Sequence, residues 1–149
     1  MLVGEICNRA AVVVAADADL LSAAQLMRTQ HVGYLVVTAN GSEQGAPVGV
    51  LTDRDIVVEV VSKGVDPLQL KAEDAMSREP LVISADARPE HALRQMRTFG
   101  VRRTPVVDSA GRLVGVLALD DVLEWLAGAL SDAAGVVRRE QRIERQKRA

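Results

Sequence analysis

Hydroxyl and carboxylate side chains follow short apolar runs at two places in this sequence. Thr52 directly follows residues 49–51 and Asp55 lies three positions further on, and Asp121 follows a second such run at residues 115–117. At both places a helical pattern begins beside the acidic residue, so each site reads as a strand, a turn and a helix start. Carboxylates and hydroxyls beside the free N–H groups of a helix N-terminus can hold sugar hydroxyls and phosphates. Residues of these types also cap helices without binding a ligand, and one copy alone leaves both interpretations open.

The two sites belong to a repeat that covers most of the chain. A shift of 69 positions places Asp17 on Asp86 and residues 27–29 on residues 96–98, and after the second strand of each copy the shift falls to 66. Each copy predicts the order β-α-β-β-α, with helices that begin near Asp19 and Pro89. The expected strands are 12–14, 34–38 and 48–51 in the first copy and 81–83, 104–107 and 113–117 in the second, and the final helices are 53–63 and 120–129.

This doubled order predicts an α/β fold of tandem repeats with a shared cleft between two equivalent faces. Clefts at such junctions are common ligand sites. A structural pseudo-dimer without a ligand is the alternative.

Composition is consistent with one compact, soluble domain. The chain has 149 residues, a net charge of -2 and 48% hydrophobic residues. Its single Cys excludes an intramolecular disulfide and is typical of a reducing compartment. No stretch of about 18 apolar residues predicts a membrane span, and the apolar residues 10–16 lack the preceding basic cluster of a signal peptide. We expect an unprocessed cytoplasmic protein.

Three segments carry a resemblance to a known family. They are Val-Gly-Val-Leu-Thr-Asp-Arg-Asp-Ile-Val at 48–57, Gly-Val-Arg-Arg-Thr-Pro-Val-Val-Asp at 100–108, and Leu-Val-Gly-Val-Leu-Ala-Leu-Asp-Asp-Val-Leu at 113–123. With both copies in register over about residues 3–128, the sequence resembles the CBS-domain family, named after cystathionine β-synthase, as a tandem pair or Bateman module. The resemblance implies a first CBS motif at 1–66 and a second at 72–130, related by a pseudo-two-fold axis. Residues 64–67, Gly-Val-Asp-Pro, break the preceding helix and predict a linker at 67–71, and residues 131–149 remain as a basic C-terminal helical tail.

The resemblance also implies a ligand. CBS pairs typically bind adenosine compounds (AMP, ADP, ATP, sometimes S-adenosylmethionine or NAD) in two clefts. Carried over by position, one cleft, the Asp121 cleft, has Asp121 on the ribose, Arg102 and Arg103 on phosphate, and Asn8, Ala10 and Val32 around the base. The other, the Asp55 cleft, has Thr52 and Asp55, with Ser77, Pro80 and Val101 around the base.

The two implied clefts differ in their polar groups. Ala118 replaces Thr52 in the Asp121 cleft, whereas Gly33 and Tyr34 replace the two arginines in the Asp55 cleft. Charge-assisted bonds contribute about 1.5–3 kcal/mol and neutral ones about 1 kcal/mol. We therefore expect a phosphate in the Asp121 cleft and a less anionic ligand, or none, in the Asp55 cleft. Solvated strand arginines are the alternative interpretation.

Residues for catalysis or metal binding are scarce. Cys7, His31 and His91 are the only Cys and His residues, and their spacing matches no zinc or nucleophile motif. We expect no enzyme activity and no metal, but a stand-alone regulatory protein that signals by conformational change to a protein effector in trans. CBS pairs commonly form disc-shaped dimers, so we expect a homodimer through helices 56–61 and 122–130, with Trp125 either in this contact or in the core.

The C-terminal tail supports an alternative function. Residues 136–149 carry six Lys or Arg and two Glu, a net charge of +4, which could mark a contact with nucleic acid or an acidic protein. The tail has few apolar residues and no aromatic side chain for base stacking. A solvated, partly frayed helix is the favoured interpretation, and nucleic-acid binding is not expected.

Overall fold

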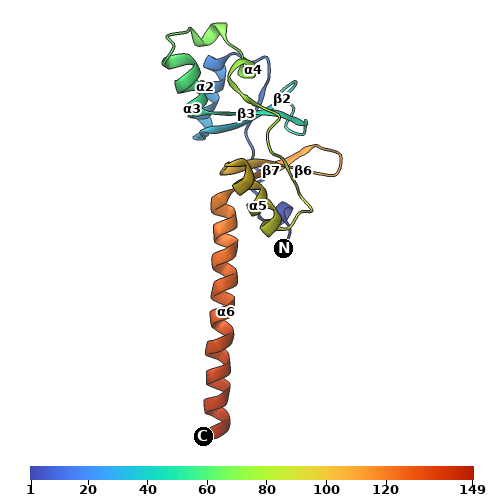
Figure 1. Cartoon of the computed structure of the whole chain (residues 1–149), viewed down its shortest axis with the longest axis vertical. Coiled ribbons are helices and arrows are strands. Elements are labelled where there is room, and N and C mark those ends of the chain that lie inside the picture. Colours follow the sequence, from blue (N-terminus) through green and yellow to red (C-terminus); the bar gives the residue numbers. More distant parts are fainter.

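A computed structural model describes all residues 1–149. The chain forms two lobes, one above the other, and a long helix that projects away from the second lobe (Figure 1). The first half contains α1 (Val3–Ile6), β1 (Val13–Ala15), α2 (Leu20–Gln30), β2 (Tyr34–Thr38), β3 (Pro47–Thr52), α3 (Asp53–Ile56) and the π-helical turn η1 (Val57–Val61). The second half contains the 3-10 turn η2 (Pro67–Gln69), α4 (Ala72–Ala75), β4 (Ser77–Arg78), β5 (Ile83–Ser84), α5 (Pro89–Phe99), β6 (Arg103–Val107), β7 (Leu113–Ala118) and α6 (Leu119–Arg148).

Local signals place the equivalent helices α2 and α5. Asp19 caps α2, because its carboxylate accepts hydrogen bonds from the backbone N–H and the hydroxyl of Ser22, both at 2.8 Å, and these bonds lower the pKa of Asp19. Pro89 opens α5 with its backbone angle already helical. Both helices end at a residue in the left-handed conformation, His31 and Gly100. The two starts agree with the sequence prediction.

Each repeat builds a small mixed sheet. In the first, β1 runs parallel to β2, β2 is antiparallel to β3, and β3 is antiparallel to β4. In the second, β5 is parallel to β6 and β6 is antiparallel to β7. The predicted tandem α/β fold is confirmed.

Each repeat pairs with the segment that leads into the other repeat. Strand β4, which opens the second repeat, pairs with β3 of the first. Asn8, from the start of the chain, pairs with Val116 of β7 through two backbone hydrogen bonds of 2.9 Å. Each sheet therefore ends on backbone from the other repeat, and the residues along these edges come from both.

Two equivalent glycines allow this exchange. A Cβ added to Gly115 would overlap the backbone carbonyl of Asn8, and one added to Gly49 would overlap the side chain of Met76. Because no side chain fits between these segments, glycine is the residue that permits the close approach at both edges.

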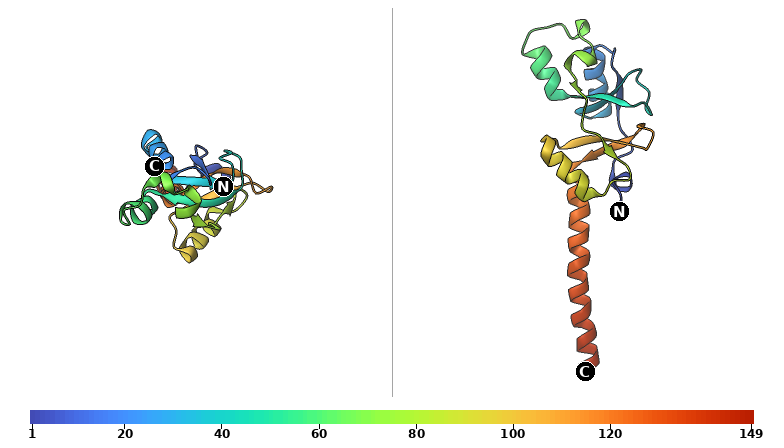
Figure 2. Two further views of the ribbon diagram at one scale, coloured as in Figure 1. Left: turned by 90° about the horizontal axis from the view of Figure 1, so that it is seen from above. Right: turned by 45° about the vertical axis from the view of Figure 1, so that its right-hand side comes forward.

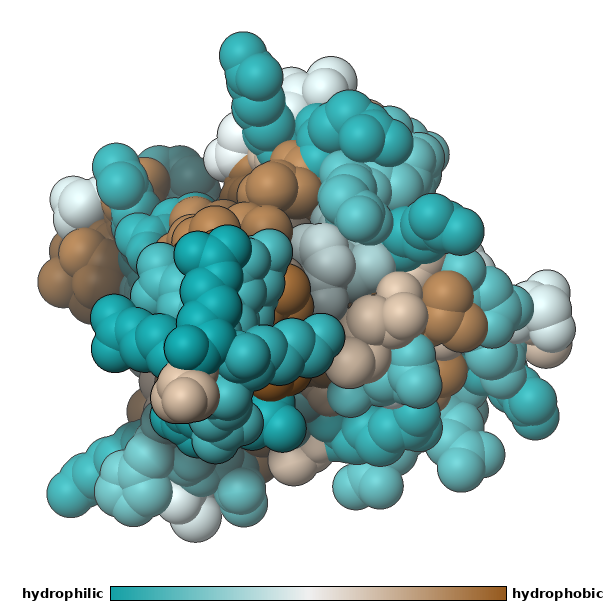
Figure 3. Space-filling view, turned by 90° about the horizontal axis from the view of Figure 1, so that it is seen from below, coloured by the Kyte–Doolittle hydropathy of each residue, from teal (hydrophilic) through white to brown (hydrophobic).

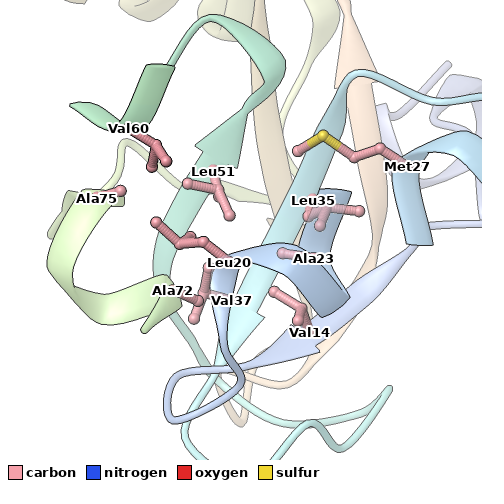
Figure 4. Close-up of a cluster of buried hydrophobic side chains, with 10 residues drawn as sticks. All are labelled: Val14, Leu20, Ala23, Met27, Leu35, Val37, Leu51, Val60, Ala72 and Ala75. Atoms are coloured by element: carbon pink, nitrogen blue, oxygen red, sulfur yellow. The ribbon is translucent and has the colours of Figure 1, made fainter. Parts of the chain in front are cut away.

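Two separate apolar clusters form the cores, and each includes residues from an exchanged segment. Figure 4 shows the first cluster, where α2 packs on the sheet of the first repeat and α4 adds Ala72 and Ala75. In the second cluster α1 adds Val3, and Cys7 follows it. The core of each lobe is therefore complete only with the segment that leads into the other repeat. Their buried members are Val14, Leu20, Ala23, Met27, Leu35, Val37, Leu51, Val60, Ala72 and Ala75 in the first, and Val3, Cys7, Ile83, Ala92, Met96, Val106, Leu117 and Val122 in the second.

Several predicted element boundaries were wrong. The helix predicted at 53–63 is α3 followed by the wider turn η1, and the strand predicted at 81–83 is β5, two residues later. The helix predicted to end at residue 129 continues to Arg148. Gly128 and Gly135 do not stop it, because one glycine costs a helix only about 1 kcal/mol. No helix of the fold combines the length and the apolar character that crossing a bilayer requires.

Candidate functional site

Two clefts lie at the junction of the lobes and are lined by residues of both repeats. The Asp121 cleft has a volume of about 290 Å³ and the Asp55 cleft about 430 Å³. Their position follows from the exchanged segments, since Asn8 borders the first and Ser77 borders the second.

The Asp121 cleft brings together five of the six residues that the resemblance assigned to it. Apolar and small residues form most of its wall, and Arg103 and Asp121 are its charged groups. Sequence reasoning left out His31, which matched no zinc or nucleophile motif and was not assigned to either cleft. The lining consists of Asn8, Ala10, Ala11, Val12, His31, Val32, Gly33, Tyr34, Arg103, Val116, Ala118 and Asp121.

The Asp55 cleft brings together four of its five assigned residues. Pro80 is absent from its wall, because Glu79 adopts a left-handed conformation with φ of 46° and turns the chain after β4. Its charged groups are two carboxylates and two guanidiniums. The lining consists of Tyr34, Val50, Thr52, Asp55, Ser77, Val101, Arg102, Arg103, Ala118, Leu119 and Asp120.

Backbone hydrogen bonds fix the carboxylate that gives each cleft its name. Asp55 Oδ2 accepts from the Thr52 N–H at 2.8 Å, and Asp121 Oδ2 accepts from the Ala118 N–H at 2.7 Å. Thr52 Oγ1 in turn accepts from the Asp55 N–H at 3.2 Å. Thr52 is therefore the N-cap residue of α3, and Asp55 and Asp121 are third-position residues whose carboxylates cap the first turn of their helices. Each cap bond occupies only one oxygen, so the other oxygen of each half-buried carboxylate can accept a bond from a ligand.

The two arginines lie differently from the sequence expectation. Arg102 borders the Asp55 cleft and not the Asp121 cleft, whereas Arg103 borders both. The chain enters β6 here, and successive side chains of extended backbone point to opposite sides. The Asp55 cleft thus contains two guanidiniums, whereas the sequence predicted that it would contain no cation.

Tyr34 and Arg103 meet where the two clefts adjoin. They are equivalent positions under the 69-residue shift, and the guanidinium carbon of Arg103 lies 5.9 Å from the centre of the Tyr34 ring. This is within the range of a cation–π interaction. Both residues line both clefts, so a group bound in either cleft contacts the same pair.

The Tyr34 hydroxyl is a polar group without a partner. It is buried and makes no hydrogen bond, and burial raises the pKa of Tyr34 far above its ordinary value, against the opposing effect of Arg103. The hydroxyl is therefore protonated at neutral pH. Burial likewise raises the pKa of the Cys7 thiol, so this thiol stays neutral. The sequence did contain a signal that Tyr34 lies at a cleft, because Tyr34 is equivalent to Arg103 in the repeat.

The clefts contain no set of metal ligands. No group of three or more His, Cys, Asp or Glu residues lies close enough together to hold a metal ion. The only histidine at a cleft, His31, has a single carboxylate, Asp121, among the other lining residues.

Comparisons with known proteins identify the repeats. The family model described as "CBS domain" matches residues 3–62 and 72–128. An uncharacterized protein of Methanopyrus kandleri, MK0525, is 32% identical over 122 residues, which are 82% of this chain and 61% of that protein. Hypoxic response protein 1 of Mycobacterium tuberculosis is 32% identical over 122 residues, 82% of each chain. The CBS domain protein PAE2072 of Pyrobaculum aerophilum, solved in complex with AMP, has 28% identity and a TM-score of 0.73, covering 86% of this chain and 99% of that one.

Proposed function

Because the chain belongs to the CBS domain family and carries two CBS motifs, we propose that it is a regulatory protein that binds an adenosine-containing ligand between them. The observation that carries this proposal is that a backbone-fixed carboxylate and an arginine line each cleft. These residues are Asp121 and Arg103 in one cleft, and Asp55 and Arg102 in the other. The AMP complex of PAE2072 supports the class of ligand.

The groups of each cleft match the parts of a nucleotide. The free oxygen of Asp121 or Asp55 accepts hydrogen bonds from ribose hydroxyls, and a guanidinium neutralises phosphate. Val32 in one cleft and Val101 in the other supply apolar surface for the base. AMP, ATP, S-adenosylmethionine and NAD share the adenosine part and differ in the charge that the arginines meet.

A ligand in either cleft contacts both repeats and so links them. If the lobes have two relative positions, binding favours the position that has the higher affinity for the ligand, by an amount set by the difference in affinity. Neither cleft pairs a nucleophile with a general base, so the proposal contains no catalytic step. The output is a change of shape that a protein effector in trans reads.

We also propose a homodimer through the apolar surface of η1. Val57, Val58 and Val61 are 56%, 45% and 68% exposed on adjacent turns. Such a cluster on a surface helix is typical of an interaction site. Trp125, an expected alternative contact, packs half-buried against the second core cluster.

Replacement of Arg103 separates the role of phosphate from that of the nucleoside. Arg103→Ala should weaken AMP binding about 10-fold or more while adenosine binding changes by less than about 3-fold, because only the charged contact is lost. Arg102→Ala is the matched control, since Arg102 borders only the Asp55 cleft and leaves the Asp121 cleft intact. Fluorescence titration of each variant with both ligands measures the effect. Equal losses for adenosine and AMP would contradict a phosphate contact.

Thermal unfolding in the presence of ligand tests the proposed function. A ligand at 100 times its Kd stabilises the folded protein by about 2.7 kcal/mol. We expect AMP, ATP, S-adenosylmethionine or NAD to raise the melting temperature, and ribose 5-phosphate, which lacks the base, to have a much smaller effect. No shift with any of the four adenosine compounds would contradict the proposal.

A further inference from the structure

The outer part of α6 has no packing partner in its own chain. Trp125 and Leu126 are the last residues of this helix that pack against the second core cluster, so residues 127–148 project from the body (Figure 1, Figure 2). At 1.5 Å per residue, this part is about 33 Å long. Helices in water owe most of their stability to the packing of an apolar face, and Gly128 and Gly135 weaken this one further. A partner that covers it would supply the missing packing.

An apolar stripe with seven-residue spacing runs along the same helix. Leu123, Leu130 and Val137 form one line of the stripe, and Val136 and Ile143 form a second line beside it. Each line repeats every seven residues, as apolar residues do in helices that pair side by side. Ala129, Ala133, Glu140 and Glu144 lie on the helix face between the two lines. Leu130 and Val136 are 72% and 67% exposed, so the stripe is uncovered in the single chain.

The charges of α6 are divided between its two halves. Residues 119–133 carry four carboxylates and no Lys or Arg, a net charge of -4, and residues 134–148 carry six Lys or Arg and two Glu, a net charge of +4. The helix dipole favours this order only in the first and last turns. It does not account for Asp132, Arg138 and Arg139 near the middle. Two antiparallel copies place each acidic half against a basic half, whereas a parallel pair places like charges together.

A hollow at the root of α6 is complementary to the basic end of a second helix. It has a volume of about 470 Å³ and is lined by Asp121, Glu124 and Asp132 together with Trp125. Glu124 and Asp132, which line neither ligand cleft, and the indole ring suit guanidinium and ammonium groups. Figure 3, which looks along α6 from the C-terminal end, shows hydrophilic side chains at the tip of the helix.

We propose that α6 pairs in antiparallel orientation with α6 of a second copy of this chain, through the stripe that contains Leu130, Val136 and Val137. The pairing uses the same surface on both copies, so it closes as a two-fold dimer. It lies almost entirely beyond residue 128, where the second CBS motif ends, and it is separate from the contact proposed for η1. The two contacts together join more than two copies, so loss of the α6 contact lowers the mass in solution while the η1 contact remains. It does not depend on ligand binding in the clefts.

The mass of the full-length protein in solution tests the pairing. Val137→Glu replaces an apolar contact of the stripe by a carboxylate three residues from Glu140, and we expect it to weaken self-association about 10-fold or more in sedimentation equilibrium, because apolar contact is lost and a second carboxylate is desolvated beside the first. Ser131→Glu, on the opposite face of the same helix, is the matched control and should change the association constant by less than about 2-fold. Both positions are exposed, so neither substitution affects the folding of the lobes. A mass that Val137→Glu leaves unchanged would overturn the proposal.

Disulfide crosslinking tests the orientation. Positions 129 and 140 lie on the stripe about 16 Å apart along the helix. Oxidation of a mixture of Ala129→Cys and Glu140→Cys proteins should give mainly the mixed dimer if the helices are antiparallel. Wild type is the control, because its single thiol, Cys7, is buried. Dimers of each variant with itself, or no crosslinking, would overturn the proposal, and the latter would leave the basic half free to bind nucleic acid or an acidic protein.

Discussion

Asp121→Ala is expected to weaken binding of adenosine nucleotides 10- to 100-fold, and to lower stability as well. The loss of affinity follows from one or two missing hydrogen bonds to ribose, about 1.5–3 kcal/mol. The loss of stability follows from the bond that Asp121 Oδ2 accepts from the Ala118 N–H at 2.7 Å. A cap of this kind contributes about 1 kcal/mol. Calorimetric titration and thermal unfolding measure the two effects separately.

Asp121→Asn is the control that separates these two roles. The asparagine carbonyl oxygen can still accept from the Ala118 N–H, so stability should stay within about 0.5 kcal/mol of wild type. Affinity should still fall, because the amide is a weaker acceptor than a carboxylate. If Asp121→Ala lowers the melting temperature but leaves nucleotide affinity unchanged, Asp121 is a cap only and the Asp121 cleft has another use.

Gly115→Ala is expected to destabilise the protein by about 2–3 kcal/mol. Its Cβ would overlap the carbonyl oxygen of Asn8, which is held by its hydrogen bond from the Val116 N–H. Neither the backbone at Asn8 nor the backbone of β7 can move apart without loss of the hydrogen bonds between Asn8 and Val116. The melting temperature should therefore fall by roughly 6–12 °C. Affinity at the Asp121 cleft should fall too, since Asn8 borders it. Thermal and denaturant unfolding measure the change.

Two other glycine substitutions show whether the overlap is the cause. Gly49→Ala, at the equivalent position, should cost less, because the nearest atoms belong to the flexible side chain of Met76. Gly135→Ala has no neighbouring atom within 4 Å and should not lower the melting temperature, since alanine favours the helix. Equal losses for Gly115→Ala and Gly135→Ala would contradict the close-approach explanation.

The repeat pattern predicted the order of the elements because side-chain periodicity is a local property. Strand β2 was expected with the bounds that the structure shows, and the cap Asp19 and the first-turn Pro89 marked the starts of α2 and α5. Short helices such as α1 carry too few residues for a periodic signal. They form because tertiary packing holds Val3 in the second core cluster.

The exchange of segments depends on non-local contacts, which one sequence does not reveal. The pairing of Asn8 with Val116 joins residues at opposite ends of the repeats. For the site, position in the repeat gave the carboxylates Asp55 and Asp121, whose orientation is set by a helix start. Position in the repeat did not predict which cleft Arg102 lines, because that depends on the direction in which its side chain points at the start of β6.

The direct test of the central proposal is calorimetric titration of the ligand-free full-length protein with AMP, ATP, S-adenosylmethionine and NAD, at two salt concentrations. The account predicts saturable binding of at least one of them, weakened by salt if it carries phosphate, and weakened at least 10-fold in Asp121→Ala. The stoichiometry then shows whether one cleft or both are occupied. Absence of saturable binding for all four ligands would leave the CBS fold unaffected and contradict the assignment of the clefts to adenosine compounds.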